Sequence, residues 1–511
     1  MGAYANFLVQ QQSQNTEVAA TLTGLELPNL FALLDFVQLQ EDAEATIDLA
    51  ISLYSLLSML GKPRLLERVG QVRDAAAKEL ERTLGDSWNH ARFEATRTRI
   101  QQQLDGGQLR EALEGAQALL QRTQAAGGQA YPNADYDFAV AGWLLARVLK
   151  TAGRADQSLP LLIDARQRFE AVAKERPGLG AERMASVCLA EQGECLLYLG
   201  RFDEAAAAYE ENIQRAEQLE DSRQVAVGKG QLGNVRLAQR RYPEALAAHA
   251  EARQRFTALN EPGTVAVSWH QTGRVYQEAG QPQAAEDAYR QSLAINVRLG
   301  DVAGQASTLN QLGNLYGYLL DRPEDAAGFY RQAVAKSVDN RDLAKEGLRR
   351  SNLAITLLQL RRLDEARQEI LRAIDCDAQF GHASEPWASW SILAEIETDT
   401  GNAAAAAEAK GKAIASYLAY RRDGGENHHP DGRISLAVTQ ALRNSEPAQA
   451  STLLQQLASD PEAAQLLPFI GALQAVVAGS RDPALADQPD LHCTMAAEIL
   501  LLIESLAGDQ G

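Results

Sequence analysis

Apolar residues recur at three- and four-residue steps in the first part of the chain, over residues 30–37 and again over 47–57. This spacing places the apolar side chains on one face of an α-helix. It therefore predicts two amphipathic helices, separated from the next element by a Gly-Lys-Pro break at residues 61–63. A third helix is predicted over residues 63–84.

Further along, the pattern itself repeats. Gly193, Gly233, Gly273 and Gly313 are each 40 residues apart, and polar residues surround each one. Each glycine is followed by a turn and a second apolar series. Similar helix pairs recur from about residue 92 to residue 420, which gives about eight repeats. A fixed period of this kind indicates stacked units that each contact only their neighbours.

The repeated residues resemble those of the tetratricopeptide repeat. One unit reads Leu189, Gly193, Gly200, Ala205 and Tyr209, in the order that this repeat uses. The resemblance implies a right-handed α-solenoid of helix pairs, with helical caps at the N- and C-terminal ends. The period of 40 exceeds the usual length of about 34. In this it is similar to the longer repeats of kinesin light chains and of bacterial signalling proteins.

Changes along the chain predict five segments. Residues 1–20 are expected to be flexible or part of a helix, and residues 21–91 form an N-terminal helical region. The solenoid follows at 92–420 and a loop at 421–434. Residues 435–511 are expected to form a C-terminal helical cap, because a solenoid needs a polar-backed terminal unit.

A second resemblance lies near the N-terminus. Residues 25–36 and 42–50 are similar to the helical region that opens the repeat arm of STAND-class signalling ATPases. Such proteins place a P-loop ATPase core before this point, whereas this sequence contains no GxxxxGK[ST] motif. The resemblance implies a sensor arm without its ATPase, and an ATPase or effector module of the same system as a partner.

Composition narrows the fold and the partners. Hydrophobic residues make up 46% of the chain and aromatic residues 6%, so Ala and Leu must supply most of the core of an all-α protein. The net charge of −18 disfavours nucleic-acid binding, because it repels phosphate backbones. The longest apolar run is too short to span a membrane.

Cysteine usage indicates the compartment. The chain has four cysteines and no CxxC motif. Cys188 and Cys195 are seven residues apart on one predicted helix, about 10 Å along its axis, which is too far for a disulfide. The usage is typical of a reducing environment, so the sequence predicts a cytoplasmic protein.

Two groups have atoms suited to chemistry. Glu426, His428, His429 and Asp431 could contact a metal, but adjacent histidines point apart, which favours a solvated loop. Cys493 follows His492, and adjacent side chains on a helix diverge by about 100°, so this cysteine is predicted to be structural. The sequence therefore predicts no enzyme activity, no cofactor and no metal site.

Amide side chains repeat in register on the first helix of successive pairs. Gln231, Gln271 and Gln311 are 40 residues apart, and Asn352 joins them after a one-residue insertion near Pro323. Another polar residue follows each glutamine after three positions, on the same face. First helices of such repeats line the concave surface, so these amides could bind an extended peptide backbone. The predicted partner-binding residues are Gln231, Asn234, His270, Gln271, Arg274, Gln277, Asn310, Gln311, Asn314, Tyr318 and Asn352.

Other interpretations of this face stay open. It could be merely exposed to solvent, or the amides could bond to neighbouring repeats and hold the stack together. Our leading hypothesis is a protein–protein interaction module, the sensor or scaffold arm of a bacterial signalling or defence system. The alternatives are an adaptor for complex assembly, or a regulator that binds a small molecule or nucleic acid.

Overall fold

The computed structural model describes residues 4–5, 7–9, 16–60, 63–84, 88–106, 108–423, 425, 427, 429–488 and 490–508. All regular elements within these residues are helices, packed as consecutive pairs, which confirms the all-α, tetratricopeptide-like fold. In the segment 1–20, which was predicted to be flexible or part of a helix, residues 1–3, 6 and 10–15 lie outside the described residues. In the predicted loop, Gly424, Glu426 and His428 also lie outside them.

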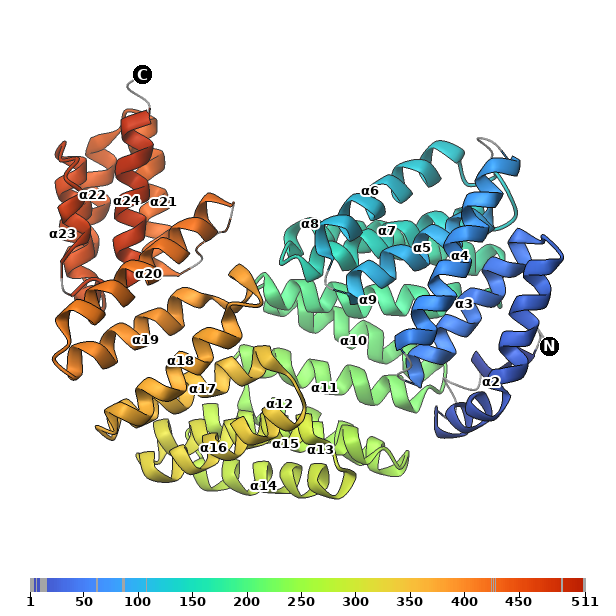
Figure 1. Cartoon of the computed structure of the whole chain (residues 1–511), viewed down its shortest axis with the longest axis horizontal. Helices are drawn as coiled ribbons and strands as arrows, with labels where there is room; N and C mark the ends of the chain where they lie inside the picture. The colour runs from blue at the N-terminus through green and yellow to red at the C-terminus, as the bar shows by residue number, and fades with distance from the viewer. Residues whose placement is uncertain are drawn as a thin grey trace. The chain divides into compact units, whose positions relative to one another are not determined.

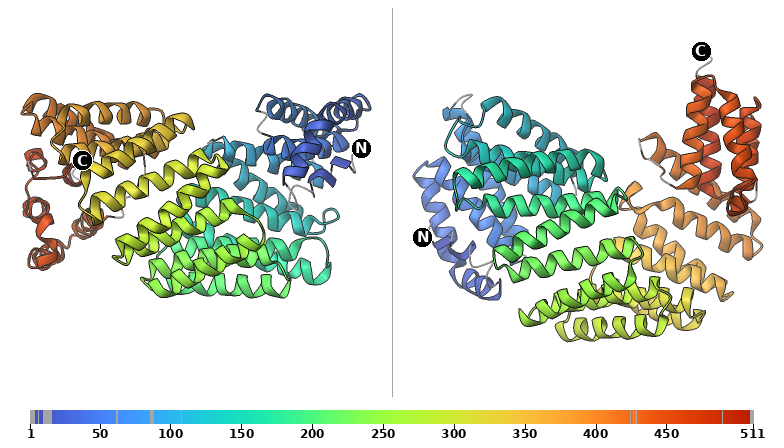
Figure 2. Two further views of the ribbon diagram at one scale, coloured as in Figure 1. Left: turned by 90° about the horizontal axis from the view of Figure 1, so that it is seen from below. Right: turned by 180° about the vertical axis from the view of Figure 1, so that it is seen from behind.

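The chain divides into two compact units, Met1–Arg255 and Phe256–Gly511. In the first unit, consecutive helices lie side by side and antiparallel (Figures 1 and 2). Helix α4 spans the predicted range, residues 63–84. The helices are α2 Thr16–Leu39, α3 Ala43–Met59, α4 Pro63–Leu84, α5 His90–Asp105, α6 Leu109–Ala126, α7 Ala134–Thr151, α8 Ala155–Glu175, α9 Ala181–Tyr198, α10 Phe202–Gln218, α11 Ser222–Ala238 and α12 Tyr242–Ala258, the last of which ends in the second unit.

The second unit continues with helix pairs and ends in a bundle. Among the helices that the structure describes, none has the length and apolarity to cross a membrane. The helices are α13 Pro262–Glu278, α14 Pro282–Leu299, α15 Val302–Asn314, α16 Pro323–Asp339, α17 Leu343–Gln359, α18 Leu363–Asp377, α19 Pro386–Asp399, α20 Ala403–Arg422, α21 Pro430–Arg443, α22 Pro447–Ala458, α23 Leu467–Val477 and α24 Cys493–Gly508.

The one-residue insertion predicted near Pro323 coincides with an irregular turn just before that residue. Helix α15 continues directly into a π-helical turn, Leu315–Leu319. The backbone N–H of Leu320 donates to the carbonyl of Leu315, 3.1 Å away, which is a bond over five residues instead of four. A π-turn holds one more residue than an α-turn, so it absorbs the insertion within the helix.

The periodic glycines explain how the two helices of a pair pack. A Cβ atom built on Gly193, Gly233, Gly273 or Gly313 would lie 2.5–2.8 Å from a ring on the second helix. Glycine at this position lets the ring lie directly on the first helix. The rings belong to Tyr209, His249, Tyr289 and Tyr330, all buried, as core packing of the aromatic positions requires.

The last helix of the chain caps the stack. Beside its partner α19, helix α20 packs against α24 from the end of the chain. The buried carboxylate of Glu498 on α24 accepts a hydrogen bond from the hydroxyl of Tyr417 (2.7 Å) and pairs with the guanidinium of Arg421 (2.9 Å). Helix α24 thus covers the second helix of the final pair, where a further repeat would otherwise stack.

Candidate functional site

The predicted amide pairs recur with one geometry. In each pair a glutamine Oε1 accepts a hydrogen bond from the residue three positions later, one turn along the same helix face. Asn234 donates to Gln231 at 3.1 Å in the first unit. In the second unit Arg274 donates to Gln271 and Asn314 donates to Gln311, both at 2.9 Å. These side chains therefore have fixed orientations before any ligand binds.

Two of the predicted residues also receive a buried tyrosine hydroxyl. Tyr330 donates to Oδ1 of Asn314 at 2.6 Å, and Tyr289 donates to Oε1 of Gln277 at 2.9 Å. Burial raises the pKa of both tyrosines, so both hydroxyls stay protonated as donors. By contrast, Oδ1 of Asn234 accepts no hydrogen bond from any residue that the structure describes.

Other predicted residues connect neighbouring first helices. Asn352 on α17 donates to Oδ1 of Asn310 on α15 at 3.1 Å. His270 on α13 lies 3.3 Å, from Nδ1 to Oγ1, from Thr308 on α15. Helices α13, α15 and α17 therefore lie side by side in the second unit. The alternative interpretation was that the polar side chains bond to neighbouring repeats and hold the stack together. This is the role of Asn310, Asn352 and His270.

Exposed and half-buried side chains of these helices form a stripe at positions i, i+4, i+7 and i+11, which lie on one helix face. We call it the first-helix stripe. It includes exposed apolar side chains that the sequence analysis missed. Val267 and Leu348 stand one turn before the amides of their helices, at the position that Ser307 holds on α15. The stripe consists of Val267, Gln271, Arg274 and Glu278 on α13; Ser307, Gln311, Asn314 and Tyr318 on α15 and its π-turn; and Leu348, Asn352, Ile355 and Gln359 on α17.

First helices in the first unit carry charges where these carry amides. Lys150 on α7 pairs with Glu194 on α9 at 2.6 Å, and it lies 3.8 Å from Glu191. Glu191 occupies the position that Gln231 holds 40 residues later on α11. The change from ion pairs to amides therefore begins at α11.

The Cys493–His492 pair differs from its prediction. Helix α24 begins at Cys493, so His492 lies outside the helix. Its Nδ1 is only 3.9 Å from the cysteine Sγ, and the predicted divergence of the two side chains is wrong. Even so, burial raises the pKa of Cys493, and the hydroxyl of Ser391 contacts its sulfur at 3.1 Å. A protonated, buried thiol is a poor nucleophile.

One group of possible metal ligands was not singled out from the sequence. Donor atoms of His90, Glu94 and Asp137 lie within 4.8 Å of one another. Nδ1 of His90 lies 2.7 Å from Oδ2 of Asp137, and this hydrogen bond raises the pKa of the imidazole. The same Oδ2 also accepts a hydrogen bond from the hydroxyl of Tyr131. Both Glu94 oxygens accept from Arg97. Because these atoms already satisfy one another, the group serves to join α5 to α7. The predicted loop at 421–434 is shorter in the structure, because α20 extends to Arg422 and α21 begins at Pro430. Asp431 therefore lies in α21, where it accepts from Thr494.

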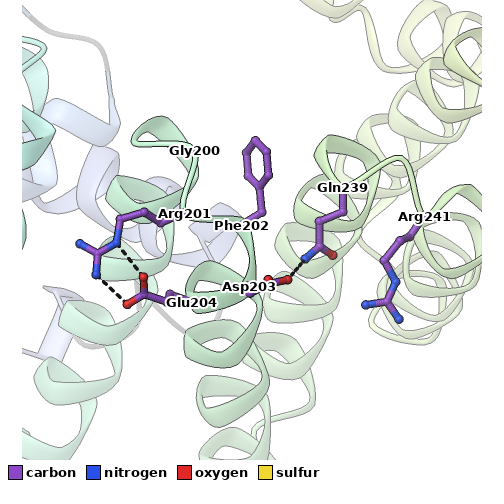
Figure 3. Close-up of a pocket in the computed structure, with 7 residues that line it drawn as sticks. All are labelled: Gly200, Arg201, Phe202, Asp203, Glu204, Gln239 and Arg241. Atoms are coloured by element: carbon purple, nitrogen blue, oxygen red, sulfur yellow. Dashed lines mark hydrogen bonds and ion pairs between the residues drawn. The ribbon is translucent and has the colours of Figure 1, made fainter.

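A hollow of about 530 Å³ lies between the turns that follow α9 and α11, within the first unit (Figure 3). Arg201 bonds to Glu204 at 2.6 Å, and Gln239 donates to Asp203 at 2.7 Å. Phe202 points its ring away from these carboxylates (Figure 3). Arg241, the other charged residue of the lining, pairs with Glu244 at 2.6 Å. The charged groups of the hollow thus already have partners, which leaves little to bind an ion.

A protein-family model described as tetratricopeptide repeat matches residues 224–296 and 266–336. The chain therefore contains tetratricopeptide repeats over α11 to α16, which confirms the predicted repeat type. Repeats of this type are generally protein- or peptide-binding modules. No curated protein matches the sequence.

Solved structures similar to the chain include the following three. The apo form of RapI is 12% identical, with 74% of this chain and 97% of that chain covered and a TM-score of 0.49. BtubC from P. vanneervenii is 19% identical, with 46% and 90% covered and a TM-score of 0.36. A STAND protein with a tetratricopeptide repeat sensor from Pyrococcus horikoshii is 14% identical, with 83% and 73% covered and a TM-score of 0.44.

Proposed function

We propose that this chain, whose residues 224–336 are tetratricopeptide repeats, binds an extended segment of a partner protein on the first-helix stripe of its second unit. The observation that carries the proposal is the composition of the stripe. It combines oriented amides with exposed apolar side chains, and it contains only two charged residues, Arg274 and Glu278.

Such a surface is suited to protein recognition. Interface centres are depleted in charged residues, whereas surfaces that only keep a protein in solution are rich in them. Amides can both donate to and accept from a peptide backbone. Val267, Tyr318 and Leu348 have exposed fractions of 58%, 64% and 60%, so they offer apolar area beside the amides. A partner can therefore gain backbone hydrogen bonds and apolar burial on the same surface.

The biological role that we propose is the sensor or scaffold arm of a bacterial signalling or defence system, acting without chemistry of its own. Its partners would be a recognised protein and an ATPase or effector module of the same system. The four cysteines are all free and buried, which suits the cytoplasmic compartment expected from the sequence. An adaptor for complex assembly would use the same stripe.

Site-specific photo-crosslinking tests the binding surface. A photoreactive amino acid is placed at Gln311, on the stripe, or at Gln332, which is exposed on the second helix α16. Each full-length variant is irradiated in lysate of the native host. We expect a discrete crosslinked protein at position 311 that excess unlabelled chain displaces, and none at 332. Equal crosslinking at both positions, or none at 311, would refute the proposed surface.

A further inference from the structure

Charged residues are absent from the stripe positions of two adjacent helices. The eight positions on α15 and α17, with the π-turn, carry Ser, Gln, Asn, Tyr, Leu, Asn, Ile and Gln. Four of these side chains are exposed and four are half-buried, and none is charged in a chain in which 23% of residues are. The two charged stripe residues, Arg274 and Glu278, both lie on α13, four positions apart.

This distribution sets the chemistry of a ligand. A charged side chain of the partner would lose water against α15 and α17 and meet no opposite charge at the stripe positions. The nearest cation on that face, Lys345, lies one turn before Leu348 and already pairs with Asp342 at 3.1 Å. Burying a polar or charged group without a partner costs several kcal/mol. An aliphatic or aromatic side chain would instead lie against Leu348, Ile355 or Tyr318. The stripe therefore penalises charged segments and favours neutral ones.

The π-turn adds an exposed aromatic side chain to this surface, and the turn itself is held in place. Tyr316, inside the turn, is buried against Phe329 with ring centroids 4.9 Å apart. Its hydroxyl also donates to Glu286 on α14 at 2.8 Å, so the turn is held by packing and by a hydrogen bond. Tyr318, two residues later, is 64% exposed, and the next residue, Leu319, is 40% exposed.

Tyr318 also lies close to the amide pair. It stands four positions after Asn314, about one turn further along the same helix, and Asn314 is held in place by the hydroxyl of Tyr330. A π-turn in a helix is often found at a functional site. Exposed tyrosines beside polar groups are frequent anchors of protein interfaces.

We infer that the first-helix stripe takes a peptide segment of low charge and aliphatic or aromatic composition, with Tyr318 as the anchor beside the Gln311–Asn314 pair. The inference rests on the proposed function and adds the class of partner to it. A site of this kind differs from a groove that selects acidic or basic peptides by charge complementarity, because it selects peptides of low charge.

The chain offers a matched control for Tyr318. Tyr198 on α9 stands three periods earlier, five residues after Gly193 as Tyr318 is five residues after Gly313. It is 72% exposed. The glutamates 191 and 194, not amides, precede it on the same face. Tyr198→Ala removes an equally exposed phenol from a charged surface.

The test is a selection of random twelve-residue peptides displayed against the full chain. We expect binders that are poor in Asp, Glu, Lys and Arg and rich in aliphatic or aromatic residues. With a synthetic selected peptide as the probe, Tyr318→Ala should weaken binding at least tenfold. Tyr198→Ala should leave it within twofold, and Tyr318→Phe should retain it if the ring is the anchor.

The outcomes separate the inference from the proposed function. Selected peptides that are rich in charge but lose affinity when Val267 or Leu348 is changed would overturn the inference and leave the binding surface in place. Peptides that bind equally well to Tyr318→Ala would overturn the role of Tyr318. If no peptide is enriched, or if no stripe substitution affects the enriched ones, both proposals fail.

Discussion

The backbone of Gly313 lies directly against the ring of Tyr330, and a Cβ atom at position 313 would be 2.5 Å from Cε1 of that ring. The hydroxyl of the same ring bonds to Asn314, the next residue along α15. One second-helix tyrosine thus determines both why a glycine recurs on the first helix and how an amide of the stripe is oriented.

Gly313→Ala should destabilise the α15–α16 pair. The new methyl group must push a buried ring aside, at a cost of about 1–3 kcal/mol, and the better helix propensity of Ala returns only about 1 kcal/mol. Gly328→Ala on α16 is the control, because no described atom outside its own helix backbone lies within 4 Å of its Cβ position. Hydrogen exchange over residues 302–339 should speed up in the first variant and stay the same or slow in the second.

Asn314 and Tyr330 should be coupled in stability. Asn314→Ala leaves a buried tyrosine hydroxyl without its acceptor, which costs about 1–3 kcal/mol. In the Asn314→Ala/Tyr330→Phe double variant that hydroxyl is gone, so most of the loss should be recovered. Thermal melting of the four members of this cycle measures the coupling. Additive losses would mean that the hydrogen bond contributes nothing.

Acid should weaken the contact between α13 and α15. Burial, and then Arg274, lower the pKa of His270 to about 4 from its ordinary value of about 6.5. The folded state binds this proton less readily than the unfolded state. The neutral imidazole therefore contributes its full share to the free energy of unfolding above pH 6.5. This contribution is lost as the pH falls toward 4, by up to about 3 kcal/mol. Exchange of the α13 and α15 amides between pH 7 and pH 4.5 should show this loss, and His270→Gln should reduce it.

Loss of one arginine should release the C-terminal cap. Arg421→Ala leaves the carboxylate of Glu498 buried without its cation, which costs about 3 kcal/mol. Arg422→Ala is the control in the next residue. Its pair with Glu504 is about half exposed on both sides and contributes less than about 1 kcal/mol. Limited proteolysis should cleave near α24 in the first variant only. Equal resistance of both variants would mean that apolar packing alone holds the cap.

The repeat could be read from the sequence because its signal is local and periodic. The glycine at 40-residue intervals follows from a ring that reaches the helix backbone, and this contact recurs in every unit where the glycine stands. The helix over residues 63–84 is likewise set by local signals, since a proline begins it. Neither feature depends on distant parts of the chain.

Other features depend on contacts that no local pattern encodes. The insertion could be counted from the spacing of Gly313 and the next repeat, but its absorption by a π-turn follows from the packing of Tyr316. Helix α24 caps α20 across a long stretch of chain, through the pairing of Glu498 with Arg421. The amide series was visible in the sequence, whereas Val267 and Leu348 were overlooked, because an isolated apolar residue on a helix ordinarily indicates core.

Leu348→Lys should abolish recognition without unfolding the chain. Leu348 is 60% exposed on the stripe, so its replacement should change stability by no more than about 0.5 kcal/mol. The new ammonium would meet a neutral ligand on a neutral surface. It would have to lose water without a partner, so affinity for a selected peptide should fall at least tenfold.

The control is Leu299→Lys. Leu299 is 46% exposed on the second helix α14, so this change introduces the same charge away from the stripe and should leave peptide binding normal. Fluorescence anisotropy with a labelled peptide measures both variants, and circular dichroism confirms their helicity. If the two lysines weaken binding equally, net charge and not the stripe governs recognition. If neither does, the partner binds elsewhere on the chain.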